Sequence, residues 1–407
     1  MKKIFFCLTL IFAVFSDFHL LVAQQNKPYL ILVSFDAFRW DYPQRGITPN
    51  LDFIKNNGVS ALSLRPAFPS KTFPNHQSII TGMYPAHHGI IHNDFTDPFT
   101  KEKYKISDSL AVSDPKWYLG EAFWETCERQ GIKTASYFWP GSELNLPYRR
   151  PTYFQHYEHK RNYYTIINGV VDWLKLPYKD RPHFITTYIH ETDDMGHKFG
   201  PNSPQANQAI QLEDSLIGYL FNKLKDADML DSTNIIILSD HGMTEVSKEK
   251  LINIEEIIGP DNKMDGEGPV MMIEPNGGDV QQVYNILKAN ENHFKVFTRN
   301  NIPDYYEFSD HPFIYSIIVV ADPGWTLVDN KSKISVMKYT RGGNHGYDKD
   351  FIDMHGIFFA YGPAFKQAYR TGTLWNIDVY PLLCKIFGIV PRSNIDGKFE
   401  RIGFILK

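Results

Sequence analysis

Short continuous apolar runs recur along the chain, and each is followed by a turn or by polar residues. The runs cover 29–35, 183–189, 234–239 and 356–361. This pattern is typical of strands that are covered on both faces in a parallel sheet. Segments with a helical pattern lie between and after these runs, at 49–57, 119–130, 163–174, 205–225 and 377–387. Strands that alternate with helices predict an α/β fold, with ligands bound at the carboxyl ends of the strands.

The pattern of apolar and polar residues changes in the segment 248–338. It contains short apolar runs, a helical pattern near 279–290 and joints rich in glycine and proline, which together predict a small α+β insertion. The segment begins soon after Asp240 and His241 and ends shortly before His345, so we expect it to overhang the site as a cap. The predicted organisation is a catalytic α/β domain in two parts with the cap between them: 24–247, 248–338 and 339–407.

The first residues, 1–23, have the layout of a secretory signal peptide. Lys2 and Lys3 precede an apolar run, and the segment ends near Ala23 before polar residues. We expect cleavage there and export to the periplasm or the medium. An uncleaved membrane anchor is the alternative, but Asp17 interrupts the run well short of the ~20 apolar residues that a span needs.

Composition narrows the class of protein. The 407 residues are 43% hydrophobic and 22% charged, which excludes a disordered chain, and the net charge of −4 gives no sign of a face for nucleic acid or for an anionic membrane. With Cys7 in the predicted signal, only Cys127 and Cys384 remain. Two cysteines do not make a disulfide framework, so we interpret each as a buried helix residue. A single bridge between them and the oligomeric state stay open.

The stretch 68–76 has the composition of a nucleophile on the first turn of a helix. Thr72 is predicted to be the N-cap, Pro74 suits the opening turn, and the helix is expected to run to Thr81 before Gly82. A hydroxyl there would lie at the positive end of the helix dipole, which stabilises an alkoxide or a phosphate. From this stretch alone, an ordinary helix cap is the stronger interpretation.

Carboxylate and imidazole side chains follow several of the predicted strands. Asp193 and His197 are four residues apart, so one helical turn can direct both at one ion. Asp240 and His241 precede a glycine, and His345 does too. Mixed ligands of this kind suit Zn²⁺ best, with Mn²⁺ or Fe²⁺ as alternatives. An isolated pair with this spacing is more often solvated, but these residues accompany one another at strand ends.

Motifs at several places along the chain match one known family in sequence and in order. They are 33–39, 48–51, 68–76, 81–85 with 88–90, Asn93, 139–142, 193–197, 239–243 and 343–347. The chain therefore resembles the nucleotide pyrophosphatase/phosphodiesterase family of the alkaline phosphatase superfamily. The resemblance spans nearly the whole chain after the signal. It implies an alkaline-phosphatase-like core sheet flanked by helices, with the small α+β cap as an insertion.

The resemblance also implies a two-zinc site and a threonine nucleophile. One ion would be held by Asp193, His197 and His345, and the other by Asp36, Asp240, His241 and Thr72. Thr72 would attack phosphorus and form a phosphothreonine intermediate, while Asn93 would donate to a non-bridging oxygen. Other divalent metals remain alternatives to zinc.

The substrate is inferred from two aromatic residues. Phe73 matches the family aromatic that stacks on a nucleobase, and Tyr157 is a candidate second face, with ordinary packing as an equal alternative. We expect an exported phosphodiesterase that cleaves nucleotide phosphodiester or pyrophosphate bonds to nucleoside 5′-monophosphates. One alternative is a choline-phosphodiester or lysophospholipid phosphodiesterase of the same fold. The other is a catalytically silent binding protein.

Several residues near these motifs match no ligand position of the family. We interpret the following as ordinary helix or turn residues: His76, His87, His88 and His190. Asp194 competes with Asp193 as a ligand, but the spacing to His197 favours Asp193. Lys71 is either a phosphate contact or a solvated lysine.

Two residues depart from the family's pattern. Ala37 follows Asp36 where the family usually has glycine, and Thr192 precedes Asp193 where it usually has proline. Neither change removes a ligand type, so we expect only the local backbone geometry to differ.

Overall fold

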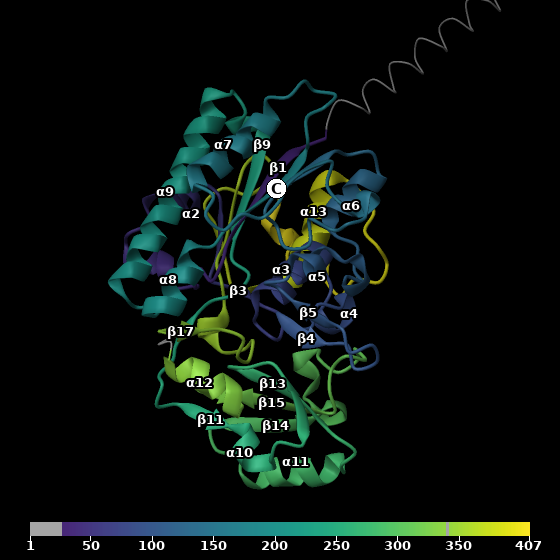
Figure 1. The fold of residues 1–407 in the computed structure, drawn as a ribbon. Helices are drawn as coiled ribbons and strands as arrows, with labels where there is room; N and C mark the ends of the chain where they lie inside the picture. Colours follow the sequence, from purple (N-terminus) through teal and green to yellow (C-terminus); the bar gives the residue numbers. More distant parts are fainter. Residues whose placement is uncertain (1–26, 339–341) are drawn as a thin grey trace, which may run out of the picture.

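The computed structural model describes residues 27–338 and 342–407, and the predicted signal segment lies outside the described residues. The main body contains a large sheet between two groups of helices, and the middle of the chain forms a smaller lobe beside it (Figure 1).

The central sheet has eight strands in the order β19-β2-β18-β9-β1-β8-β6-β7. Their bounds are β1 Tyr29–Phe35, β2 Val59–Ala61, β6 Thr134–Tyr137, β7 Tyr153–Gln155, β8 Phe184–Ile189, β9 Thr233–Leu238, β18 Phe358–Tyr361 and β19 Tyr369–Thr371. β1 pairs in parallel with β8 and β9, so that Leu32 lies opposite Thr186 and Ile236. All four apolar runs are strands of this sheet, as predicted.

One strand differs from the prediction of a parallel sheet. β18 runs antiparallel to both of its neighbours, β9 and β2. Its residues Phe358, Phe359 and Ala360 are buried like those of β1. An apolar run reports burial on both faces, and it does not report strand direction, which depends on how the connection returns to the sheet.

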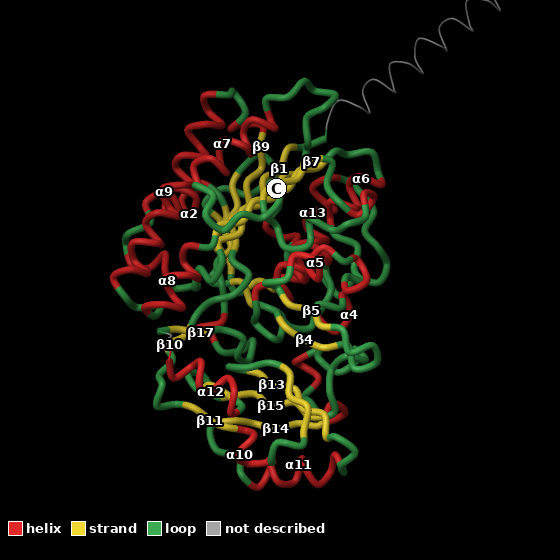
Figure 2. The backbone as a smooth tube through the Cα atoms, viewed as in Figure 1, coloured by secondary structure: helices red, strands yellow, loops and turns green. Residues whose placement is uncertain are grey.

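Alternate side chains of β1 enter different cores. Ile31 and Val33 pack with helices α2, α7 and α9, whereas Leu30 and Leu32 pack with helices α3, α6 and α13 on the other face. The two helix groups are visible on either side of the yellow strands (Figure 2). Their bounds are α2 Pro49–Asn57, α7 Tyr163–Leu174, α9 Pro204–Asp226, α3 Thr72–Thr81, α6 Phe123–Arg129 and α13 Val379–Phe387. An α/β sheet flanked by helices is confirmed.

The predicted helix 119–130 begins four residues later than expected, at Phe123 of α6. Glu125 accepts a hydrogen bond from the backbone N–H of Ala122 at 3.1 Å, which closes the first turn at that point. Cys127 of α6 and Cys384 of α13 are both buried in the same apolar core, and both are free thiols.

The middle of the chain forms a second, four-stranded antiparallel sheet with its own apolar core. Its strands follow the order β12-β13-β15-β14, and α10 and α11 accompany them (Figure 1). The bounds are β12 Asn262–Asp265, β13 Val270–Pro275, β14 Phe294–Thr298, β15 Ile317–Ala321, α10 Ile254–Ile258 and α11 Val280–Ala289.

Short ladders join the two parts of the molecule. β10 (Thr244–Glu245) pairs antiparallel with β17 (Gly343–Asn344), where the chain leaves for the smaller lobe and returns from it. This pairing brings the residues after β9 beside the residues after β17. The remaining short elements are β3 Leu64–Arg65, β4 Asp94–Thr96, β5 Lys103–Lys105, β11 Leu251–Asn253, β16 Thr326–Val328, β20 Leu374–Trp375, α4 Pro85–His88, α5 Ser109–Ser113, α8 Glu191–Phe199 and α12 Asn330–Lys338.

Candidate active site

Thr72 is the first residue of α3, and the prediction that it is the N-cap is wrong. The N-cap is Lys71, whose backbone is still extended at φ −114° and ψ 155°. The Thr72 hydroxyl instead lies 3.3 Å from Nε2 of His241. Because Thr72 is only 8% exposed, its hydroxyl is held at the helix N-terminus and is directed into the site. Lys71 is equally buried, so its interpretation as a solvated lysine is also wrong.

One cluster of ligand-type side chains adjoins Thr72. Asp36 follows β1, and Asp240 and His241 follow the neighbouring parallel strand β9, so the carboxyl ends of the two strands bring them together. Nε2 of His241 lies 3.4 Å from Oδ1 of Asp36 and 3.1 Å from Oδ2 of Asp240. All three residues are buried.

A second cluster joins α8 to the segment after β17. Oδ1 of Asp193 lies 3.3 Å from Nε2 of His197 and 3.7 Å from Nε2 of His345. The two histidine Nε2 atoms are 3.1 Å apart. The rings of His345 and His241 stack with centroids 3.7 Å apart, so the two clusters lie side by side.

The three histidines of these clusters are hydrogen-bonded through Nδ1, and their Nε2 atoms face the other side chains of the clusters. The Nδ1 atoms of His197, His241 and His345 each donate to a backbone carbonyl at 2.9 Å: those of Gly343, Gly242 and Ser70 respectively. A ring that holds its one proton at Nδ1 presents an acceptor at Nε2. Burial, followed by the nearby His241, lowers the pKa of His345 well below its ordinary value and keeps that ring neutral.

Three carboxylate oxygens in the same clusters have no hydrogen-bond donor. They are Oδ1 of Asp36, Oδ1 of Asp193 and Oδ2 of Asp240. Ligand atoms around tetrahedral zinc are about 3.3–3.6 Å apart, because Zn–N and Zn–O bonds are about 2.0–2.2 Å long. The measured separations of 3.1 to 3.7 Å bracket that spacing. The donor sets therefore fit two divalent cations, which would satisfy oxygens and nitrogens that no proton donor satisfies.

The charges of the carboxylates support the same conclusion. Burial raises the pKa of Asp36 well above its ordinary value, and the neighbouring Asp240 and Asp193 raise it further. Burial alone would also raise the pKa of Asp240, but His241 and His76 hold it below its ordinary value. A bound cation would favour the charged form of Asp36 and offset the repulsion between these carboxylates.

His76 takes part in supporting the site, which the sequence did not indicate. Its Nδ1 donates to the backbone carbonyl of Thr72 at 2.9 Å and lies 3.3 Å from Oδ2 of Asp240. Its position one turn after Thr72, on the same face of α3, is the signal that was available. Ala37 has φ 55°, in the left-handed region that glycine adopts more easily, and its N–H donates to Oδ1 of Asp240 at 3.2 Å.

A cavity of about 470 Å³ opens beside both clusters. Thr72, Asp36 and Asp193 lie in its lining, and so do the aromatic rings of Phe73 and Tyr157. Tyr157 is 46% exposed, so it is not simply packed in the core. The N–H of Phe73 donates to Oδ1 of Asn93 at 3.1 Å, which leaves the amide NH₂ of Asn93 for another partner. All the lining residues come from 36–194.

The structure also brings together a third group that was not predicted: His159, His190 and Asp194. His190 is the N-cap of α8, in agreement with its interpretation as a turn residue, but its ring faces Asp194. His159 is distant in sequence and has no local pattern that would have drawn attention to it.

In residues 27–338 and 342–407, no helix has the length and hydrophobicity needed to cross a membrane.

Comparison with known proteins identifies relatives along nearly the whole chain. A family model described as type I phosphodiesterase / nucleotide pyrophosphatase matches residues 30–348. Bis(5'-adenosyl)-triphosphatase enpp4 of Xenopus laevis is 37% identical over 372 residues, which are 91% of this chain and 80% of the frog protein. Ectonucleotide pyrophosphatase/phosphodiesterase family member 3 of Bos taurus is 36% identical over 394 residues, which are 94% of this chain but only 44% of the bovine protein.

Solved structures agree with the sequence comparison. Murine ectonucleotide pyrophosphatase / phosphodiesterase 5 superposes with a TM-score of 0.87 at 31% identity, covering 94% of this chain and 100% of the murine chain. An inactive threonine-to-alanine variant of the murine protein, solved in complex with AMP, superposes with a TM-score of 0.88. The chain belongs to the type I phosphodiesterase / nucleotide pyrophosphatase family of metal-dependent enzymes.

Proposed function

We propose that this chain is an exported, zinc-dependent phosphodiesterase that cleaves nucleotide phosphodiester or pyrophosphate bonds and releases nucleoside 5′-monophosphates. The observation that carries the proposal is the pair of ligand clusters with unpartnered carboxylate oxygens beside the buried hydroxyl of Thr72. The frog relative is named as a bis(5'-adenosyl)-triphosphatase, and the inactive murine variant binds AMP, which supports a nucleotide substrate.

Two zinc ions would be held by the two clusters described above. One set comprises Asp193, His197 and His345, and the other Asp36, Asp240, His241 and Thr72. Bound zinc lowers the pKa of a neighbouring hydroxyl and stabilises developing negative charge on oxygen.

The chain's own residues would carry out the remaining tasks. Oγ1 of Thr72 attacks phosphorus in line, which forms a phosphothreonine intermediate and releases the leaving group. The N-terminus of α3 favours the negative charge that gathers there. The Asn93 amide, whose oxygen is occupied by the N–H of Phe73, donates to a non-bridging phosphate oxygen. Water then hydrolyses the intermediate, and two in-line steps retain the configuration at phosphorus.

A nucleotide is better supported than a choline phosphodiester, because a murine relative is solved in complex with AMP and the aromatic rings of the cavity can stack on a base. Phe73 and Tyr157 belong to one cavity that also contains Thr72, so a base stacked on either ring would lie next to the nucleophile. A silent binding protein is disfavoured because all the proposed ligands and the hydroxyl converge in the site.

Export and the domain division are part of the same proposal. The signal-like residues 1–23 support export to the periplasm or the medium, as do the names of relatives described as ectonucleotide or venom enzymes. We further propose that residues 248–338 form a separate folding unit that caps the catalytic domain, which their own sheet and apolar core support.

A chelation experiment tests the function. Turnover of a nucleoside triphosphate and of bis-p-nitrophenyl phosphate should disappear with a chelator and return with Zn²⁺, whereas glycerophosphocholine should be a poor substrate. Thr72→Ala should bind a nucleoside monophosphate without turnover, and Thr152→Ala, which changes an exposed threonine outside the cavity, should retain full activity. Activity that survives chelation would contradict the two-metal mechanism, and preferred turnover of glycerophosphocholine would contradict the nucleotide substrate.

A further inference from the structure

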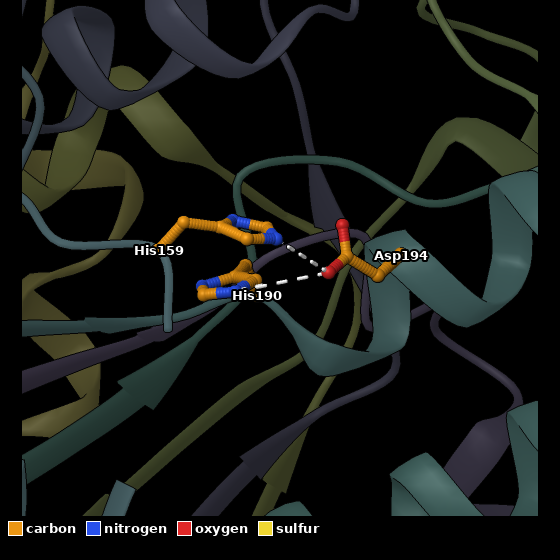
Figure 3. A group of neighbouring side chains, drawn as sticks. All are labelled: His159, His190 and Asp194. Carbon is orange, nitrogen blue, oxygen red and sulfur yellow. Dashed lines mark ion pairs between the residues drawn. The ribbon is translucent and has the colours of Figure 1, made fainter. Parts of the chain in front are cut away.

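A third set of metal-ligand side chains lies in the wall of the cavity, away from the two clusters assigned to zinc. It consists of His159, His190 and Asp194, and Figure 3 shows both imidazole rings facing the same carboxylate. Oδ2 of Asp194 is 3.3 Å from Nε2 of His159 and 3.7 Å from Nε2 of His190. One ligand atom from each residue lies within 4.8 Å of the others.

This geometry is not explained by hydrogen bonding alone. The contact of 3.7 Å between His190 and Asp194 is too long for a hydrogen bond. The two rings are stacked, with centroids 4.3 Å apart and planes 23° apart, so both Nε2 atoms point the same way. A 6% exposed imidazole thus directs Nε2 at a carboxylate from a distance that is too long for a hydrogen bond.

The two contacts of the Asp194 carboxylate oxygen have the spacing of neighbouring ligands in a coordination shell. Tetrahedral zinc ligands are about 3.3–3.6 Å apart, and the two measured contacts of 3.3 and 3.7 Å are close to that range. Two imidazoles and one carboxylate also form a donor set that occurs at zinc sites with an open fourth position.

The set is separate from the two-metal site because neighbouring residues of α8 serve different clusters. Asp193 lies beside His197 and His345, whereas Asp194 lies beside His159 and His190. Both carboxylates line the same cavity. A cation held by Asp194 would therefore lie on the cavity wall without sharing a ligand with the other two.

We propose that His159, His190 and Asp194 form a third divalent-cation site, which takes Zn²⁺ or a cation of similar ligand preference such as Co²⁺. The site has a structural consequence for the cavity. Nδ1 of His159 lies 3.0 Å from the hydroxyl of Tyr157, so a cation that fixes the His159 ring also fixes the tyrosine beside it.

Metal stoichiometry tests the proposal without relying on turnover. The full chain is stripped with a chelator, dialysed against Zn²⁺ and analysed for bound metal. We expect three ions per chain for the wild type, two for His159→Ala and three for His156→Ala. His156 is a matched control because it is an exposed histidine of the same loop that belongs to none of the three groups.

His159→Ala is a suitable variant because the His159 side chain is 55% exposed, and circular dichroism checks that it folds. Anomalous scattering from crystals of the Co²⁺-loaded wild type supplies a second measurement, with a peak expected between the three side chains. Two ions in the wild type, or an unchanged count in His159→Ala, would overturn the third site. Neither outcome bears on the proposed function, which hydrolysis of bis-p-nitrophenyl phosphate tests separately.

Discussion

Single hydrogen bonds decide which atoms of the candidate site are available to a ligand. The Nδ1 contacts of His197, His241 and His345 with backbone carbonyls leave Nε2 as the atom of each ring that faces the two clusters. In the same way, the N–H of Phe73 occupies the oxygen of Asn93. The residue types were predictable from the sequence, but most of these hydrogen-bond partners were not. Apart from Gly242, which follows His241, the partners are backbone groups of other segments.

At this scale, Phe73 and Tyr157 test the proposed substrate. Phe73→Ala and Tyr157→Ala should each raise KM for a nucleoside triphosphate by roughly tenfold to a hundredfold, because stacking of a base on an aromatic ring contributes about 1–3 kcal/mol. Steady-state kinetics with the triphosphate, compared with bis-p-nitrophenyl phosphate, would show the effect.

Tyr148→Ala is the control for this prediction, since Tyr148 is 75% exposed and lies outside the cavity lining. It should leave KM unchanged. If the Phe73 and Tyr157 variants bind the triphosphate as well as the wild type does, these rings do not hold the base.

At the scale of elements, a buried polar contact joins α8 to α9. Glu213 of α9 is fully buried, and its two carboxyl oxygens meet the N–H of Thr192 at 3.1 Å and its hydroxyl at 2.9 Å. The same hydroxyl reaches the backbone carbonyl of Asp36. Proline, usual in the family at the position of Thr192, has neither the N–H nor the hydroxyl. The departure at Thr192 therefore connects the strand end that carries Asp36 to α9.

Substitution of Glu213 should change how stability depends on pH. Burial raises the pKa of Glu213 well above its ordinary value of 4.5, although Thr192 opposes the shift and Glu191 adds to it. The folded state therefore binds more protons than the unfolded state, and the free energy of unfolding falls as pH rises from 4.5 through the folded pKa. Glu213→Gln keeps a donor and an acceptor and removes this loss, so the variant should gain stability relative to the wild type as pH rises.

Urea denaturation at a series of pH values above 4.5 measures this difference. Glu249→Gln, at an exposed position, should follow the wild type throughout. An identical pH dependence for Glu213→Gln and the wild type would mean that Glu213 is ionised in the folded protein.

At the scale of the whole molecule, the smaller lobe packs on the loop that leads to Thr72. Phe68, four residues before Thr72, is fully buried and meets Tyr306 and Phe308 with ring centroids 4.5 and 5.3 Å away. Thr96 of β4 donates from its backbone to Asp265 of β12 at 2.8 Å. An apolar core shared by both parts surrounds these contacts, so the lobe supports the start of α3.

Removal of the Phe68 ring should weaken this junction. Phe68→Ala leaves a cavity between the two parts, and truncation of a buried phenylalanine costs about 3–5 kcal/mol. Chemical denaturation should show that loss, whereas Phe99→Ala, at a position that is 73% exposed, should remain within about 0.5 kcal/mol of the wild type. A loss of less than about 1 kcal/mol for Phe68→Ala would show that the junction does not contribute to stability in this way.

The sequence by itself determined four strands of the central sheet, several of the helices that flank it and the types of side chain at the strand ends. The run 29–35 became β1 with the bounds expected, because both of its faces are buried and a continuous apolar run reports that directly. The helix at Thr72 ended at Thr81 as predicted, because Gly82 adopts the left-handed conformation that closes it. These features depend on residues that are close together along the chain, so they can be predicted from the sequence alone.

Tertiary structure alone decided the features that join distant segments. Three features leave no local pattern. They are the antiparallel direction of β18, the choice of Lys71 over Thr72 as the N-cap, and the approach of His159 to the i, i+4 pair His190 and Asp194. Each feature depends on where a remote part of the chain lies. For example, the Thr72 hydroxyl lies beside Nε2 of His241, which is distant in the sequence, and does not bond to the backbone of its own helix. The local sequence limits which residues can take part in the site, and long-range packing determines which of their atoms face one another.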